Sequence, residues 1–405
     1  MKHTSYTTSG PKDAGRIGQN IPHGRGSESD PIKVIVAGGD GTAHELIEGI
    51  VSLPESSGSN RTWQLIILPL GTVSQGTSKD LLTVQANALH ASLSSEKSSD
   101  VPADVEAALP SDQESRETLS SLISSLSPSS KPSPLPITLT TITDSDGNPT
   151  RDSPIPSHIV LSTSLHAALL HTSEELRTEY PGLERFKVAA QRNLGVFFQA
   201  QVKFLAPPAG VVQQYNSKSK TFVPPYTAED DILDGPFTYL LSTTTCERLE
   251  PTFVINPTLK SLPTNASTPT MDIIVLRPLR DPDVRSATTS DEQQERWKKR
   301  AMEVIGHAYK GGGHVDLLYS EEGGETKSKG EGDVVVETFR VGGFEWTPTV
   351  SFLHPSLPEL TLKDSDHSPS HLVCADGSIH TIPAGGRARV EVASETSGNL
   401  FYAWA

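Results

Sequence analysis

The stretch of sequence that decides the fold runs from Ile32 to Thr42 and reads Ile-Lys-Val-Ile-Val-Ala-Gly-Gly-Asp-Gly-Thr. Its first half is short, apolar and β-branched, which predicts a strand that leads directly into a glycine loop. From Ala43 to Val51 the apolar residues recur with helical spacing. A second apolar run covers residues 63–68 and is most simply a buried parallel strand. A strand, a glycine loop, a helix and a second strand are typical of a doubly wound α/β sheet, so we expect that fold for residues 31–92.

The glycine loop has the composition of a phosphate-binding site. Glycine allows backbone N–H groups to come close to a phosphate, and the helix that follows directs its positive end toward the anion. Asp40, between Gly39 and Gly41, is placed to accept a proton from an attacking hydroxyl or to orient a Mg²⁺–nucleotide complex. A structural interpretation stays open. Thr42 fits a helix N-cap with Glu45 as its capping-box partner, and Gly39 with Asp40 fits a tight turn.

The remainder of the chain divides by composition. Residues 1–30 mix Gly, Ser, Thr and Pro without periodicity, which predicts a disordered lead-in. Residues 93–134 are rich in Ser, Pro and acidic side chains, which predicts a loose linker with one short amphipathic helix between Leu119 and Leu126. Residues 135–405 contain many short apolar segments with hairpin-like spacing and one long helical pattern, at 291–309. We therefore expect a β-rich second domain, most simply a β-sandwich.

Charge and composition exclude several classes of protein. The chain has 34 Lys and Arg against 49 Asp and Glu, a formal net charge of −15, whereas a nucleic-acid binder needs clustered cations. The two cysteines, Cys246 and Cys374, form no disulfide framework or zinc motif, which favours a reducing, cytoplasmic compartment. The 13 histidines match no ligand spacing, so we expect no metal held by histidine. No apolar run approaches the ~20 residues of a membrane span, so any membrane contact is expected to be peripheral.

Residues 36–50 read Val-Ala-Gly-Gly-Asp-Gly-Thr-Ala-His-Glu-Leu-Ile-Glu-Gly-Ile and resemble the signature of the diacylglycerol kinase catalytic domain. Sphingosine, ceramide and bacterial lipid kinases share that domain, and the His44-Glu45 step is most similar to the sphingosine kinases. Three further segments resemble the family in order and spacing: residues 67–72, residues 161–186 and Asp376-Gly377.

The resemblance implies a role for each of these positions. Asp40 would be the general base of phosphoryl transfer. The residues implied around the ATP phosphates are Gly38, Gly39, Gly41, Thr42 and Glu45. Those implied to contact the rest of the nucleotide, its phosphate charge or Mg²⁺ are Gly71, Thr72, Arg177, Arg185, Asp376 and Gly377. Two alternatives stay open, because the two arginines also fit solvent-exposed helix positions and Asp376-Gly377 also fits a hairpin turn.

The sequence departs from the family pattern at four places. The strand and Asn-Pro-x-Ser-Gly loop with which the family opens have no counterpart before Ile32, so the first domain is expected to be truncated at its start. The second nucleotide loop, usually Gly-Thr/Ser-Gly-Asn, reads Gly-Thr-Val-Ser at residues 71–74. Residues 167–170 lack the carboxylate with which sphingosine kinases recognise the lipid head group, and Ser378 stands where the family has the Glu of Asp-Gly-Glu.

The sequence therefore predicts a truncated α/β doubly wound domain followed by a β-sandwich-rich C-terminal domain. We expect an ATP-dependent lipid kinase that transfers the γ-phosphate to the hydroxyl of a sphingoid base, ceramide or diacylglycerol. Its cofactors would be ATP and Mg²⁺, its partner a lipid, and its membrane contact peripheral. Two alternatives remain: a catalytically impaired relative that binds lipid or nucleotide, and an NAD kinase, which shares the Gly-Gly-Asp-Gly loop.

Overall fold

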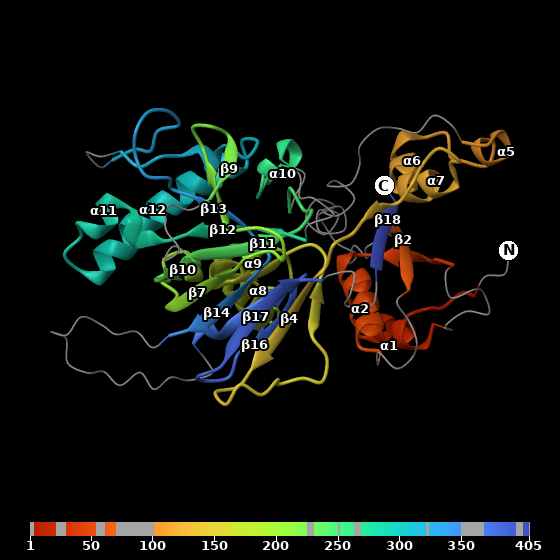
Figure 1. The fold of residues 1–405 in the computed structure, drawn as a ribbon, viewed down its shortest axis with the longest axis horizontal. Helices are drawn as coiled ribbons and strands as arrows, with labels where there is room; N and C mark the ends of the chain where they lie inside the picture. The colour runs from red at the N-terminus through yellow and green to blue at the C-terminus, as the bar shows by residue number, and fades with distance from the viewer. Residues whose placement is uncertain are drawn as a thin grey trace.

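The computed structural model describes residues 4–21, 30–53, 61–69, 101–224, 231–249, 252–262, 269–320, 324–349, 368–393 and 400–404. These residues form three sheets, one of four strands, one of six and one of eight. The four-stranded sheet, with the helices around it, forms one part of the molecule, and the two larger sheets form the other (Figure 1). The mixed α/β composition agrees with the sequence prediction, and the two-part arrangement is compatible with it.

The first sheet contains both strands that the apolar runs predict. Its strands, in spatial order, are β1 (Ile32–Gly38), β2 (Thr62–Pro69), β18 (Leu400–Trp404) and β3 (Ser133–Pro134). β1 and β2 are parallel, as expected, with Ile32 opposite Trp63 and Gly38 opposite Pro69. β18 was not expected here. It lies parallel to β2 although some 330 residues separate the two in sequence, so the C-terminal strand belongs to the first part and not to the β-rich second part (Figure 1).

The helix α2 (Asp40–Val51) follows β1 directly and packs its apolar face on the sheet. Ala43, Ile47 and Ile50 are buried with Val36 and Leu65 in one cluster. The predicted strand, loop, helix and strand are therefore confirmed.

The expected disordered lead-in contains a helix, α1 (Asp13–Asn20), that packs against α2. Two glycines make the close crossing possible: a Cβ on Gly49 would collide with the carbonyl group of Gly15, and a Cβ on Gly18 would lie 2.6 Å from the carbonyl oxygen of Leu46. The backbone N–H of Lys12, the residue before the helix, also donates to Glu45 Oε1 at 3.0 Å. Composition suggested disorder because α1 has few apolar residues, and its packing relies on backbone contact.

The expected linker is also more ordered than its composition predicts. It forms α5 (Ala103–Glu106), α6 (Gln113–Thr118) and α7 (Ser120–Leu126), of which α7 coincides with the predicted short helix. The buried residue of α7 is Ser121, while Leu126 is largely exposed. Ser121 Oγ donates to the carbonyl of Trp404 at 2.6 Å and accepts from the backbone N–H of Ile67 at 3.1 Å. A buried hydroxyl therefore fixes α7 to β2 and β18, which a search for an apolar face does not reveal.

The second part is built on two sheets that share one core. The six-stranded sheet consists, in spatial order, of β10 (Ile232–Asp234), β7 (Ala200–Leu205), β14 (Gly343–Pro348), β17 (Arg387–Val392), β4 (Thr138–Thr143) and β5 (Ile155–Ser157). The eight-stranded sheet consists of β16 (Ser378–Thr381), β15 (Leu372–Ala375), β6 (Leu161–Thr163), β11 (Tyr239–Thr243), β12 (Met271–Leu276), β13 (Glu337–Val341), β8 (Gln213–Asn216) and β9 (Thr221–Val223). Val202, Phe344 and Trp346 of the first meet Ile273 and Phe339 of the second in that core. This packing agrees with the expected β-sandwich.

Helices pack against the eight-stranded sheet. The three longest are α8 (Ser164–Glu175), α9 (Glu184–Asn193) and α12 (Ser290–Ala308). α12 coincides closely with the helical pattern at 291–309. None of the helices in the described ranges is long and apolar enough to cross a membrane.

Candidate active site

A cavity of about 760 Å³ lies between the eight-stranded sheet and the helices α8, α9 and α12. Most of its wall is apolar and includes Ile159, Val160, Leu165, Leu169, Leu170, Phe186, Ile274, Leu276, Trp297, Ala301, Val304 and Ile305. The same cavity is lined by two polar segments, Gly39–Thr42 at the start of α2 and Asp376–Ser378 at the β15–β16 turn. We call these two segments the polar end of the cavity. The predicted phosphate loop therefore opens onto a space that suits an apolar ligand.

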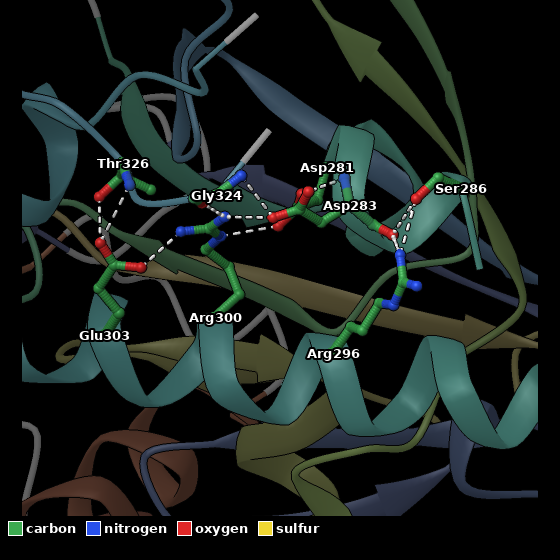
Figure 2. A network of polar contacts seen from close by, with 8 residues as sticks. All are labelled: Asp281, Asp283, Ser286, Arg296, Arg300, Glu303, Gly324 and Thr326. Atoms are coloured by element: carbon green, nitrogen blue, oxygen red, sulfur yellow. Dashed lines mark hydrogen bonds and ion pairs between the residues drawn. The ribbon is translucent and has the colours of Figure 1, made fainter. Parts of the chain in front are cut away.

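A network of ion pairs holds the α12 wall of this cavity in place (Figure 2). Arg300, buried in the middle of the helix, donates from Nε to Asp281 Oδ2 at 2.7 Å and from Nη1 to Glu303 Oε2 at 2.5 Å. Its Nη2 donates to the carbonyl of Gly324. Trp297, on the turn before Arg300, is fully buried against the cavity. The network thus fixes the helix that carries much of the apolar wall.

The glycine loop differs from its predicted form in where the helix begins. Gly39, in an extended conformation, is the N-cap of α2, so Thr42 is not the cap, and Glu45 binds Lys12 and not the cap residue. The capping-box interpretation is therefore wrong. The first hydrogen bonds run from the N–H groups of Thr42 and Ala43 to the carbonyl of Gly39. The N–H groups of Asp40 and Gly41 precede them and take no part in the helix, as expected at a helix start that can hold an anion.

Asp40 lies at the polar end with its carboxylate unengaged. It is half-buried, and its side chain has no hydrogen bond or ion pair with any residue that the structure describes. Burial, and then repulsion from Asp376, raise the pKa of Asp40 well above its usual value. Gly41, beside it, is open: a Cβ there would meet no atom within 4 Å. A carboxylate with a raised pKa next to open space is suited to accepting a proton from a bound hydroxyl.

Asp376 has the opposite environment, because its carboxylate is fully engaged. It occupies the left-handed region with φ 47° in the two-residue turn between β15 and β16, so the hairpin interpretation is confirmed. Three backbone N–H groups, of residues 158–160, donate to its two oxygens at 2.8–3.0 Å, and Ser157 Oγ donates at 2.7 Å. His44 of α2 adds a contact from Nδ1 at 3.1 Å. Asp376 therefore joins the turn, residues 157–160 and α2 into one unit.

The charges around Asp376 explain its ionisation. Burial alone would raise the pKa of Asp376, but His158, 2.7 Å away, and His44 hold it well below its usual range. Burial likewise opposes the charged form of His44, yet the hydrogen bond to Asp376 raises the pKa of His44 overall. Ligand atoms of these three residues lie within 4.8 Å of one another, close enough to hold a cation by distance alone. Because the oxygens of Asp376 already accept from four protein donors, the cluster is better described as a buried carboxylate between two histidines.

The two predicted arginines lie together, but not at the cavity. Arg177 is largely exposed and pairs with Glu174 at 2.9 Å, and the half-buried Arg185 lies 3.8 Å from the same carboxylate. Neither is among the described residues that line the cavity. Arg177 is thus an exposed arginine just beyond the end of α8, whereas the side chain of Arg185, in α9, is only 15% exposed. Gly71 and Thr72 lie outside the described residues.

Two cavity residues have no counterpart among the predicted site residues. His166 and Tyr239 line the cavity from α8 and β11, beside apolar neighbours. In the sequence, His166 is one of 13 histidines whose spacing matches no ligand pattern. The signal that could have found it is its position one turn before Leu169 and Leu170, at the start of a helix that faces the cavity.

Comparison with known proteins places the glycine loop within a known domain. The family model of the diacylglycerol kinase catalytic domain matches residues 1–105. Among solved structures, the chain is similar to that of a candidate diacylglycerol kinase from Bacillus anthracis str. Sterne, with 12% sequence identity, a TM-score of 0.43, and coverage of 98% of this chain and 84% of that chain. No curated protein matches the chain. The family match includes the glycine loop and ends before the residues that form the cavity walls.

Proposed function

We propose that the chain transfers the γ-phosphate of ATP to the hydroxyl of a lipid, since residues 1–105 match the family model of the diacylglycerol kinase catalytic domain. The observation that carries this proposal is the cavity, which joins the glycine loop at Gly39–Thr42 to a long apolar wall in one continuous space. A dinucleotide such as NAD is polar along its whole length and would leave that wall unused. A lipid instead has an apolar chain for the wall and a hydroxyl for the polar end.

The residues of the polar end support a defined division of roles. Asp40 accepts the proton of the lipid hydroxyl as it attacks, because its carboxylate is free and its pKa is raised well above its usual value. The N–H groups at the start of α2 bind phosphate oxygens of the nucleotide. A bound Mg²⁺ would neutralise phosphate charge, and the hydroxyl of Thr42 would supply one of the oxygen ligands that such a hard cation prefers. Asp376, whose oxygens are occupied, holds the polar end together and leaves the Mg²⁺ to other groups.

A second candidate function is lipid binding without turnover. Phosphoryl transfer depends on neutralising the charge of the transferred group. No lysine or arginine is among the described residues that line the cavity, and Ser378 replaces the carboxylate of the family motif. Without these charged groups the site would bind and stabilise the transferred phosphate less well, while the apolar cavity stays intact. Both features therefore favour a protein that binds lipid without phosphorylating it.

The test is transfer of labelled phosphate from ATP to a panel that contains monoacylglycerol, diacylglycerol, sphingosine, ceramide and NAD, with Mg²⁺ present. The proposal predicts a phosphorylated lipid and no phosphorylated NAD. Labelled NAD without labelled lipid would show that the proposal is wrong. No labelled product, together with saturable lipid binding, would support the second candidate.

The variant Asp40→Asn separates the chemical role of the carboxylate from its place in the fold. It keeps the size of the side chain and removes the base, so the transfer rate should fall by roughly 10²–10⁴-fold while lipid binding is unchanged. Asp146→Asn, at an exposed position of a different Asp-Gly turn, serves as the matched control and should keep the full rate. An Asp40→Asn protein that retains the normal rate would show that Asp40 is not the base.

A further inference from the structure

His166 offers one free hydrogen-bonding atom to the cavity. Its Nδ1 lies 2.7 Å from Ser162 Oγ, at the end of β6, and this contact fixes the plane of the ring. Its Nε2 has no hydrogen-bond partner among the residues that the structure describes, although the ring lines the cavity. Ser164, with φ 57°, makes the sharp turn from β6 into α8 that brings the ring to this position. A polar atom held in a fixed direction inside an apolar cavity is what a site needs to orient a ligand.

The ring of His166 is neutral at physiological pH. Burial lowers the pKa of His166 to about 4. The neutral ring exchanges one hydrogen bond through Nε2, as donor or as acceptor according to which nitrogen carries the proton. A hydroxyl or a carbonyl oxygen satisfies such an atom without bringing a charge into the cavity.

From these observations we infer that His166 orients the lipid in this cavity. Its Nε2 hydrogen-bonds an uncharged oxygen of the lipid head group other than the hydroxyl that receives the phosphate. The inference deepens the proposed function, on which it rests for the identity of the acceptor hydroxyl. A monoacylglycerol, which has a second hydroxyl and an ester group close to the acceptor, is a suitable probe.

The test measures binding without turnover. Trp297 is fully buried against the cavity, so a lipid with bromine on its chain quenches the fluorescence of Trp297 when it enters. Titrations would use chain-brominated monoacylglycerol and chain-brominated octadecanol, which has one hydroxyl and no second oxygen. The ratio of the two affinities, compared between the unsubstituted protein and variants of His166, isolates the contribution of the second oxygen from that of the chain.

Variants of His166 test the hydrogen bond itself. His166→Leu should weaken monoacylglycerol binding about three- to tenfold, the usual effect of losing one neutral hydrogen bond, and leave octadecanol binding unchanged. His166→Gln keeps a hydrogen-bonding group and should restore most of the affinity for monoacylglycerol. His171→Leu, on the same helix but exposed, should change neither. An equal loss for monoacylglycerol and octadecanol in His166→Leu would show that His166 only packs.

The two ideas fail separately. Binding of monoacylglycerol that is weakened by His166→Leu, without phosphate transfer to any lipid, would refute the proposed function and keep the inference. Phosphate transfer to lipids whose binding His166→Leu leaves unchanged would refute the inference and keep the lipid-kinase proposal.

Discussion

The two carboxylates at the polar end of the cavity, Asp40 and Asp376, differ in their hydrogen bonds and in the direction of their pKa shifts. Asp40 has no partner among the described residues and a raised pKa, whereas Asp376 accepts from four protein donors and has a lowered pKa. Asp376 helps to set the state of Asp40, because the charge of Asp376 disfavours ionisation of Asp40. This pattern supports the proposed roles, proton transfer for Asp40 and positioning for Asp376.

Replacing Asp376 should therefore damage the fold first. In Asp376→Asn the side chain loses the charge that pairs with His44 and His158, and an NH₂ group faces donors in place of one acceptor oxygen. We expect a loss of about 3–5 kcal/mol in the free energy of unfolding, measured with urea. Because Asp376 would no longer repel the charge on Asp40, the pKa of Asp40 should also move back toward its usual value.

The control for this substitution is another Asp-Gly turn. Asp146→Asn changes the same residue type before Gly147, which has φ 85°, but Asp146 is exposed. Its free energy of unfolding should stay within about 0.5 kcal/mol of the unsubstituted protein. An Asp376→Asn protein with normal stability and no phosphate transfer would instead identify Asp376 as a ligand of Mg²⁺ or nucleotide.

At the scale of elements, the helices that the sequence does not predict are held by backbone contacts or by a single polar atom. α1 lies against α2 through glycines, and α7 is fixed by the hydroxyl of Ser121. Neither kind of contact leaves an apolar period in the sequence, so composition predicts disorder for both segments. α12, in contrast, has a long amphipathic pattern with Thr289 as its N-cap, and its limits are predicted to within a residue.

Substitution of Gly49 tests the backbone contact between α1 and α2. A methyl group in Gly49→Ala would collide with the carbonyl of Gly15, so α1 should separate from α2. Amide hydrogen exchange across residues 13–20 should then become fast, while exchange in β1 and β2 stays slow. Trypsin should also cleave sooner after Arg16, whose side chain is 72% exposed but whose backbone is helical.

The matched control lies in α12. A Cβ on Gly306 would meet no atom within 4 Å, so Gly306→Ala should stabilise the protein by about 0.5–1 kcal/mol through the higher helix propensity of alanine. Unchanged exchange of residues 13–20 in Gly49→Ala would mean that α1 is held by other contacts, such as that between Lys12 and Glu45.

At the scale of the whole molecule, local sequence patterns predict elements that are adjacent in the sequence. They do not predict contacts between segments that are far apart in the sequence. The β1–α2–β2 unit follows from apolar periods and glycines within one short segment, and the family motif lies in the same segment. The place of β18 beside β2 depends on pairing between residues 400–404 and 62–66, which no local pattern records. The cavity is likewise assembled from β6, β11, β12 and three helices, so its polar atoms, His166 among them, cannot be recognised before the fold is known.

Buried histidines make the whole molecule sensitive to mild acid. Burial lowers the pKa of His166, His314 and His380 to about 4, against 6.5 for an ordinary histidine. Between pH 6.5 and 4 the unfolded chain therefore binds more protons than the folded one, so stability falls as the pH falls through this window. Each such histidine contributes a slope of up to about 1.4 kcal/mol per pH unit. The raised pKa values of His44 and Asp40 act in the opposite sense, because the folded state binds protons more readily there.

His314 provides the sharpest test, because it is 4% exposed and its Nε2 lies 3.1 Å from the carbonyl of Ile255. His314→Gln keeps a donor for that carbonyl and removes the titrating ring. Between pH 6.5 and 5, urea unfolding should show a slope of stability against pH that is lower by about 1 kcal/mol per pH unit than in the unsubstituted protein. His171→Gln, at an exposed position, should leave the slope unchanged. Parallel curves for His314→Gln and the unsubstituted protein would mean that His314 is protonated as easily when folded as when unfolded. Acid lability would then have to come from other groups whose pKa is lowered by burial, such as His166 and His380.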